Sequence, residues 1–463
     1  MLDAAETVKS APAVTSPVSA RSRRLARRHH EWMVIRVMLF ALAWCVITAS
    51  WPGRDSRSPD ELYEGDLDLA IKFQIAAWAA VGIATVIVLW SRLAAAVRTI
   101  MRSSLRWYAL FAIVALCSSA WSVSPALTAF RGLQLCAALL LVVLIVWATE
   151  GRPIYTLYFC YGCVAVMALA AGACWILVPG ETDNALGPPL FRGTLAIVAA
   201  LCAVATIPRA MSSAQRRTGQ WAVVLVVLTG IVLAGRGRGI VIAYGLVALL
   251  GMLLSFKGRL AALFVATTIT CAAFAYSQQL WDYFNRADVG GGDIWTLNGR
   301  LPIWDEIIRM RHDLPWLGRG FVAGSRDWFV EEFVARGGGF AAQHAHNAWL
   351  SALIETGLPG LFCLVMLTGV FIRWSGRIVL RAMAREPHSS LSGLKAGFAL
   401  VAAYALVISI AWHGLAARAG PTLLPMLLCC YWIRPGSRRS ASPSTPRARR
   451  KPDDEQPAQR GPS

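Results

Sequence analysis

The chain has 463 residues, of which 56% are hydrophobic and 15% are charged, and its formal net charge is +19. This much apolar surface excludes a water-soluble fold of the same length and predicts an all-α integral membrane protein. Because the hydrocarbon core of a bilayer is about 30 Å thick, each spanning helix needs about 20 apolar residues.

Apolar runs of about this length predict about twelve transmembrane helices. In chain order they cover residues 33–50, 71–90, 107–122, 130–149, 154–178, 190–207, 220–235, 239–256, 260–276, 358–374, 396–412 and 417–433. The pair within 220–256 is separated only by a short turn. One long helix in its place would carry Arg236 and Arg238 at mid-membrane, at a cost of about 2.5 to 3.5 kcal/mol each, so a turn is favoured.

Basic residues gather in both tails and in alternate loops, and such an excess marks the cytoplasmic side of a membrane protein. Both termini are therefore expected in the cytoplasm. The resulting organisation is a disordered basic cytoplasmic tail at 1–32, transmembrane helices 1 to 9 at 33–276, a large periplasmic loop at 277–357, transmembrane helices 10 to 12 at 358–433, and a second disordered basic cytoplasmic tail at 434–463.

The large extracytoplasmic loop is too long to be a simple linker and is expected to carry short helices. One helix begins near Pro302, with acidic residues in its first turns and basic residues near its end. A second covers 326–336. A run of histidines and an asparagine, "QHAHN" at 343–347, then precedes the helix that leads into the next span.

The turn "GRGRG" at 235–239 is expected on the outer side, where two arginines run against the local charge bias. They are explained either by snorkelling to lipid phosphates and capping a helix end, or by a bidentate clamp on an anion that the glycines allow to come close. The turn alone does not decide between these explanations.

Three motifs in this order resemble the O-antigen ligase and polymerase superfamily of membrane glycosyltransferases, over about residues 220 to 375. An outward arginine followed by glycine is similar to Arg238-Gly239. An arginine before a Trp-containing helix and a Pro-x-x-Gly-x-Gly turn resembles the set Arg300, Trp304, Pro315, Gly318 and Gly320. A His-Asn pair followed by an apolar helix and Gly-x-x-Gly resembles the set His346, Asn347, Gly357 and Gly360. The family usually has a serine where Gly237 stands.

The resemblance implies a glycan donor linked through pyrophosphate to a polyprenyl lipid, used at the outer face of the bacterial inner membrane. The acceptor would be the hydroxyl of a glycan or glycolipid, and membrane lipids would be further partners. Arginines suit the charge that builds on a pyrophosphate leaving group, and a histidine suits removal of the hydroxyl proton. The implied catalytic residues are His346, Arg238 and Arg300, and the implied substrate-binding residues are Arg236, Trp304, Arg319 and Asn347.

Several alternatives remain at this stage. His346 would otherwise cap a helix or face solvent, and Trp304 would anchor an amphipathic helix. His344 and His346 lack further ligands at useful spacing, so we expect no metal and no cofactor. The Pro-, Ser- and Arg-rich tails are expected to bind anionic lipid and no nucleic acid. The main rival function is a polysaccharide or lipid-linked glycan transporter or flippase, although such proteins usually carry charges at the membrane midplane. Ligase and polymerase are not distinguished.

Overall fold

The structure is a computed structural model that describes residues 17–48, 69–177, 189–211, 218–235, 237–254, 300–329, 345–385, 390–411 and 420–433, with isolated positions between 259 and 278. Every regular element in these residues is a helix, and no strand occurs among them. The predicted all-α class is therefore confirmed for the described part of the chain.

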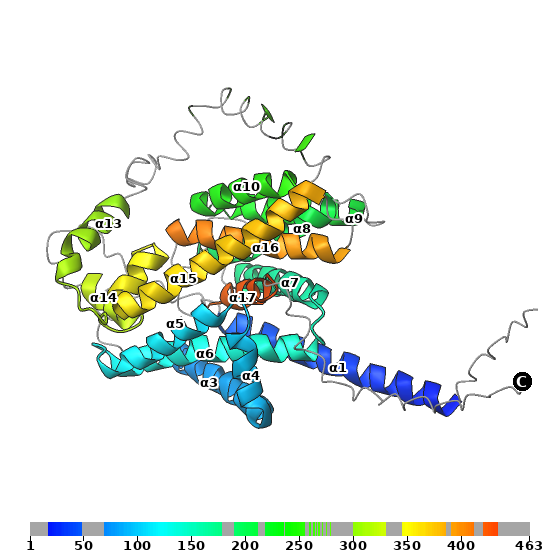
Figure 1. Ribbon diagram of the computed structural model, residues 1–463, viewed down its shortest axis with the longest axis horizontal. Helices are drawn as coiled ribbons and strands as arrows, with labels where there is room; N and C mark the ends of the chain where they lie inside the picture. Colours follow the sequence, from blue (N-terminus) through cyan, green and yellow to red (C-terminus); the bar gives the residue numbers. More distant parts are fainter. Residues whose placement is uncertain are drawn as a thin grey trace, which may run out of the picture.

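The helices form a bundle with a small cap at one end (Figure 1). The bundle contains α1 (Pro17–Thr48), α3 (Leu69–Leu89), α4 (Leu93–Met101), α5 (Arg106–Cys117), α6 (Pro125–Ala148), α7 (Ile154–Leu177), α8 (Pro189–Ala210), α9 (Thr218–Ala234), α10 (Arg238–Met252), α15 (Ala348–Arg385), α16 (Ser390–Ala411) and α17 (Leu423–Tyr431). The cap contains α13 (Arg300–Arg309) and α14 (Ala323–Trp328). Three single-turn helices join these elements: η1 (Trp90–Arg92), η2 (Ser118–Ala120) and η5 (Met310–His312).

Six helices are long and apolar enough to cross a membrane, which supports a multi-pass membrane protein. They are Ile75–Met101, Pro125–Ala148, Ile154–Ala173, Gly193–Ala210, Ala348–Ala384 and Leu391–Ile410. Shorter apolar helices cover Arg106–Ala120, Gly219–Ala234 and Arg238–Met252. The span predicted at 260–276 is described only at isolated positions, so the count of twelve stays a prediction.

Two predicted segments differ from the structure. Helix α1 begins at Pro17, inside the tail 1–32 that was predicted to be disordered. Its arginines and alanines are good helix formers, and proline is well tolerated in a first turn. At the other end of the chain, the span predicted at 417–433 contains α17, a helix of 9 residues that are all buried. Because these residues are buried, the described part of the segment is an interior helix of the bundle. At about 13 Å it is also shorter than the hydrocarbon core.

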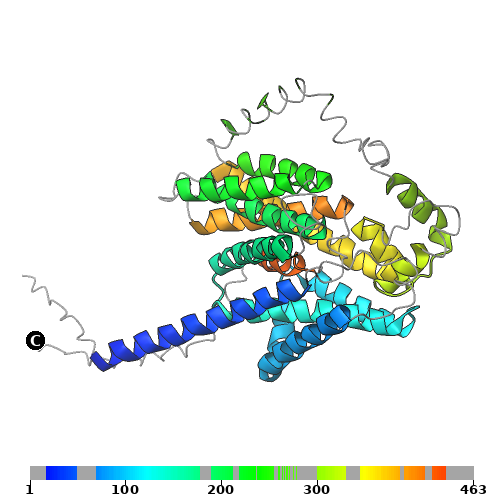
Figure 2. The same cartoon turned by 180° about the vertical axis from the view of Figure 1, so that it is seen from behind.

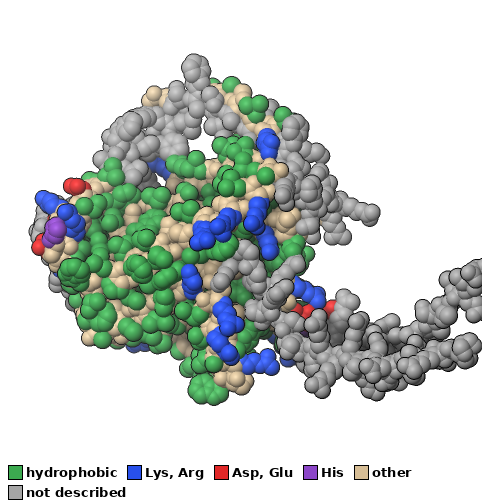
Figure 3. Space-filling view, in the orientation of Figure 1, with side chains coloured by type: hydrophobic (Ala, Val, Ile, Leu, Met, Phe, Trp, Pro, Cys, Tyr) green, Lys and Arg blue, Asp and Glu red, His purple; other side chains and the backbone are tan. Residues whose placement is uncertain are grey.

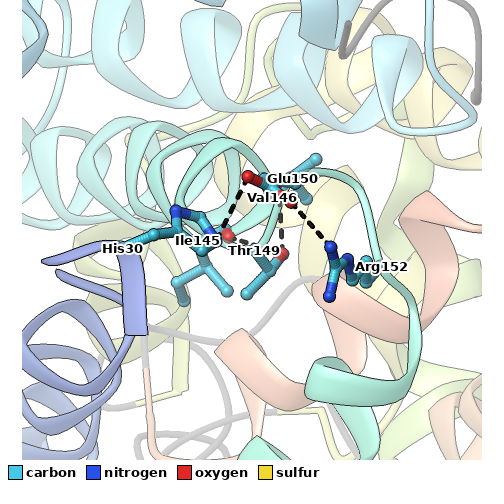
Figure 4. A network of polar contacts seen from close by, with 6 residues as sticks. All are labelled: His30, Ile145, Val146, Thr149, Glu150 and Arg152. Carbon is cyan, nitrogen blue, oxygen red and sulfur yellow. Dashed lines mark hydrogen bonds and ion pairs between the residues drawn. The ribbon is translucent and has the colours of Figure 1, made fainter. Parts of the chain in front are cut away.

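The start of α1 and the cap lie at opposite ends of the bundle in both views (Figures 1 and 2). On the α1 side, the imidazole of His30 lies 3.4 Å from the carboxylate of Glu150, which also pairs with Arg152 at 2.9 Å. These contacts join α1 to the connection between α6 and α7 (Figure 4). Exposed polar contacts of this kind contribute little to stability.

Hydrophobic side chains cover most of the face between the two ends, as expected for a surface in contact with lipid tails (Figure 3). Exposed arginines lie in α4 and directly after it, at the start of α5, and toward the end of α15. They are Arg98, Arg102, Arg106, Arg373, Arg377 and Arg381. Arginines also occur next to the cap, at Arg309 and Arg311, so the charge asymmetry between the two sides of the membrane stays a prediction.

Helix α15 is broken at Gly357, whose φ of 63° and ψ of −157° are not helical. The break exposes backbone groups that pair with the Pro-x-x-Gly-x-Gly turn. Arg319 N donates to Ile354 O at 2.9 Å, Gly320 N donates to Glu355 O at 2.9 Å, and Leu358 N donates to Trp316 O at 3.0 Å. A Cβ atom at Gly357 would overlap the carbonyl oxygen of Trp316, so only glycine fits. These bonds fasten the cap to α15.

We expect the cap and the far end of α15 to face opposite sides of the membrane. Asp313, which follows η5, and Arg381, near the end of α15, are both exposed. In intact spheroplasts, a membrane-impermeant maleimide should label Asp313→Cys, and should label Arg381→Cys only after the membrane is opened. The unsubstituted protein corrects for its own cysteines. Labelling of both positions from one face would contradict the predicted topology.

The substitution Gly357→Ala should destabilise the protein, because alanine is strained at this φ and ψ and collides with the turn. The backbone strain alone is about 1 to 3 kcal/mol. We expect a fall of several degrees in the melting temperature of the detergent-purified protein. Gly369→Ala is the matched control in the same helix, since nothing lies within 4 Å of a Cβ atom there. Equal melting temperatures for the two variants would refute the proposed constraint.

Candidate active site

Helix α13 packs its apolar stripe against the beginning of α15. Ile303 and Ile307 are buried in a small cluster that also contains Trp328 of α14 and Ile354 of α15. The stripe has the helical spacing that the sequence predicts, and its burial orients the remaining faces of the helix. Arg300, the first residue of α13, is thereby held at the edge of this cluster.

Trp304 is attached to the segment that precedes α15. Its indole N–H donates a hydrogen bond to the carbonyl oxygen of Ala345 at 2.8 Å. Its ring packs against the apolar cluster. Trp304 was predicted to contact substrate or to anchor the helix, and in the structure it holds the residue immediately before His346.

Asn347 caps the beginning of α15. Its side-chain oxygen accepts hydrogen bonds from the N–H groups of Trp349 at 3.0 Å and Leu350 at 3.1 Å, the usual geometry of an N-cap. Its side-chain nitrogen lies 3.4 Å from the carbonyl oxygen of Ile410, near the end of α16. Asn347 is thus a structural residue in this geometry, and its predicted contact with substrate stays a prediction.

His346 lies between these two anchored residues and has an unusual backbone. Its φ of 50° is in the left-handed region, which few residues other than glycine adopt. Strain of this kind is often concentrated at functional sites. Burial, together with the positive charge of nearby Arg300, lowers the pKa of His346 from 6.5 to about 4. At neutral pH the imidazole is therefore uncharged and able to accept a proton.

The position of Arg238 follows from the directions of three packed helices. Near the end of α10, Gly251 lies against Ile207 of α8 and Leu400 of α16. Because Ile207 is also near the end of α8 and the two helices pack along each other, α8 and α10 run in the same direction. Helix α16 runs in the opposite direction, since Gly397 and Gly393 lie beside Ala205 and Pro208 in turn.

Arg238 therefore lies at the end of the bundle that carries the cap. It precedes Gly251 by thirteen residues, or about 20 Å along α10. Ile410 lies ten residues beyond Leu400, or about 15 Å along α16 in the same spatial direction. Since the Asn347 amide approaches Ile410, helix packing brings Arg238 to the same end of the bundle as His346.

Arg319 occupies the turn fastened to α15. Its guanidinium lies 3.3 Å from the carboxylate of Asp327 in α14. Its backbone carbonyl accepts a hydrogen bond from Val123 N at 3.2 Å, where α6 begins. Arg319 thus joins the cap to two helices of the bundle, on a different part of α15 from the Arg300 and His346 pair.

Sequence reasoning missed two carboxylates in this region. Asp327 pairs with Arg319, and Glu355 is buried where its carboxylate accepts a hydrogen bond from the Ser325 hydroxyl at 2.6 Å. A carboxylate inside an apolar helix, as at Glu355, is a signal that the sequence itself contains. Asp327 gave no such signal, because its partner is known only from the folded turn.

The remaining predicted residues are placed as follows. Arg236 and His344 lie outside the described residues. His312 is exposed at the end of η5. In the described part of the chain, no group of three or more His, Cys, Asp or Glu side chains lies close enough to hold a metal ion. The structure thus brings together Arg300, Trp304, His346 and Asn347, and it places Arg238 and Arg319 at the same end of the bundle.

Comparison with known proteins identifies the same region. Residues 221–365 match a family model described as O-Antigen ligase. The match begins in α9 and ends in α15, so it contains Arg238, Arg300, Arg319 and His346. This confirms the resemblance found from the motifs and supports a membrane enzyme of polysaccharide assembly. No curated protein matches the chain.

The lowered pKa of His346 is measurable by NMR titration of histidine-labelled protein, with His346→Gln used to assign the resonance. The native imidazole should titrate well below pH 6.5. In Arg300→Gln, loss of the positive charge removes a repulsion that disfavours imidazolium, so the pKa should rise toward 6.5 while remaining lowered by burial. A native pKa near 6.5, or no rise in Arg300→Gln, would contradict the described geometry.

Proposed function

We propose that the chain transfers or polymerises glycan from a polyprenyl-pyrophosphate-linked donor onto an acceptor hydroxyl, at the outer face of the bacterial inner membrane. The observation that carries this proposal is the pair formed by uncharged His346 and Arg300 at the strained beginning of α15. It lies within the segment that matches O-Antigen ligase. A neutral base beside a fixed cation suits a reaction in which a proton is removed while an anion departs.

In the proposed reaction, the acceptor oxygen attacks the anomeric carbon of the donor sugar. The bond from this carbon to the pyrophosphate oxygen breaks, and the polyprenyl pyrophosphate leaves with the bonding electrons. The hydroxyl proton passes to the imidazole of His346 and is later released to water. Arg300 and Arg238 stabilise the negative charge on the leaving group, since guanidinium groups bind phosphate oxygens in bidentate fashion.

Donor binding would also strengthen the base. In the free protein, Arg300 lowers the pKa of His346 by repelling the imidazolium form. A bound pyrophosphate offsets this charge, so the repulsion weakens and His346 becomes more basic when the donor is in place. Proton removal is thereby favoured only in the complex that reacts.

The other predicted residues act on the positions of these groups. Trp304 and Asn347 hold the backbone on either side of His346. Arg319 is oriented by Asp327 and is proposed to contact the donor or the acceptor at the margin of the site. Arg236 is proposed as a weaker contact of the pyrophosphate. The proposal includes no metal and no cofactor.

The transporter alternative requires movement of a lipid-linked glycan with no new glycosidic bond. A purified enzyme in lipid nanodiscs distinguishes the two functions, because a nanodisc has no separate compartments and reports only transfer. Formation of an elongated or newly attached glycan from a lipid-linked donor supports the proposal. Its absence with every tested acceptor, combined with donor translocation in sealed vesicles, would favour transport.

The catalytic assignment is tested with this transfer assay at matched protein levels. His346→Ala, Arg300→Ala and Arg238→Ala should each reduce turnover about a hundredfold or more. Lysine at either arginine should not restore activity, because it keeps the charge and loses the two-point contact. His312→Ala is the matched control and should retain near-native turnover, since His312 is exposed at the end of η5, beyond the last residue of α13. Near-native turnover in Arg300→Ala or His346→Ala would refute the mechanism.

A further inference from the structure

Helix α6 contains a charged residue within an apolar helix that is long enough to cross the membrane. Arg131 is the seventh residue of Pro125–Ala148, and the proposed reaction does not use it. A guanidinium at such a position is costly in a bilayer, and ionisable residues of this kind usually line a pathway or a binding site.

The helical register directs Arg131 toward the interior. Residues four, seven and eleven positions later on the same face are Leu135, Ala138 and Val142, and all three are 0% exposed. The guanidinium NH1 donates to the side-chain oxygen of Gln134 at 2.9 Å, and Gln134 is itself 2% exposed. Arg131 is therefore oriented by a buried partner on the inward face of α6.

The depth of Arg131 is set by the attachment of α6 to the cap. One turn earlier, the Thr128 hydroxyl donates to the carbonyl oxygen of Phe321 at 3.1 Å and lies 2.7 Å from the Ser122 hydroxyl. Phe321 follows the turn that carries Arg319. Arg131 is thus about 4.5 Å along the helix axis from the contact with the cap, on the membrane side of it.

We infer that Arg131, held by Gln134, is a further anion-binding residue of the donor site and contacts the phosphate nearest the polyprenyl chain. This inference rests on the proposed function. A polyprenyl chain stays in hydrocarbon while its glycan reaches water, so its phosphates lie at the boundary between the two, just inside the cap. An inward guanidinium at that depth meets the lipid-proximal phosphate, whereas Arg300 acts from the aqueous side.

The inference is tested by steady-state kinetics in nanodiscs with a lipid-linked glycan donor at varied concentration. Arg131→Gln should raise the KM for donor roughly tenfold or more and change kcat less, because it removes a contact made in both ground and transition states. Arg131→Lys keeps the charge, and it should raise KM by a smaller factor. Gln134→Leu should also raise KM, since it removes the partner that orients the guanidinium.

Arg106→Gln is the matched control. Arg106 is an exposed arginine at the beginning of α5, stacked on Trp107 with 5.5 Å between the guanidinium carbon and the ring centroid. The KM for donor of this variant should remain native.

If Arg131→Gln does not fold, Arg131→Lys and Gln134→Leu carry the test. Native donor KM in the folded Arg131 and Gln134 variants, with Arg300→Ala and His346→Ala inactive, would overturn the inference and leave the proposed function intact. Absence of transfer by the unsubstituted enzyme would instead refute the proposed function.

Discussion

The backbone pairing across the break in α15 is the constraint on which the outer end of the molecule depends. An uninterrupted helix would satisfy its carbonyls internally and offer nothing to the turn at 315–320. The left-handed Gly357 frees these groups, and the turn uses them. The same turn is bound from its other side by Val123 and Thr128 at the beginning of α6. The turn at 315–320 therefore joins the cap both to α15 and to the start of α6.

The bundle supplies a rigid base for this cap because its helices approach closely. Helix α8 contains many buried alanines and packs against α16, where a Cβ atom at Gly397 would overlap the carbonyl oxygen of Ala205. Small residues let helices approach closely in membranes, where the association of helices depends on close packing more than on exclusion of water. The ends of α10, α15 and α16 are thereby held at fixed positions, and the chemically important residues lie at or next to these ends.

Electrostatics at the site follow from this rigidity. Arg300 begins α13, whose Ile303 and Ile307 are buried, and its positive charge adds to burial in lowering the pKa of His346. Arg319 pairs with Asp327. A guanidinium held by a carboxylate in this way mainly positions the chain. The two arginines are thus suited to different tasks, although their motifs are adjacent in sequence.

The sequence by itself determined the membrane class, most of the long helices and the region that matches O-Antigen ligase. Apolar run length and loop charge are local properties, and the cost of polar groups in lipid makes them decisive. Only the tertiary structure decided that Asn347 caps a helix, that α17 lies inside the bundle and that Arg131 faces inward. It also decided that Arg300 lowers the pKa of His346. These facts depend on contacts between residues far apart in the chain, which are set by how helices pack and where α15 breaks, and neither is written in the local pattern of apolar residues.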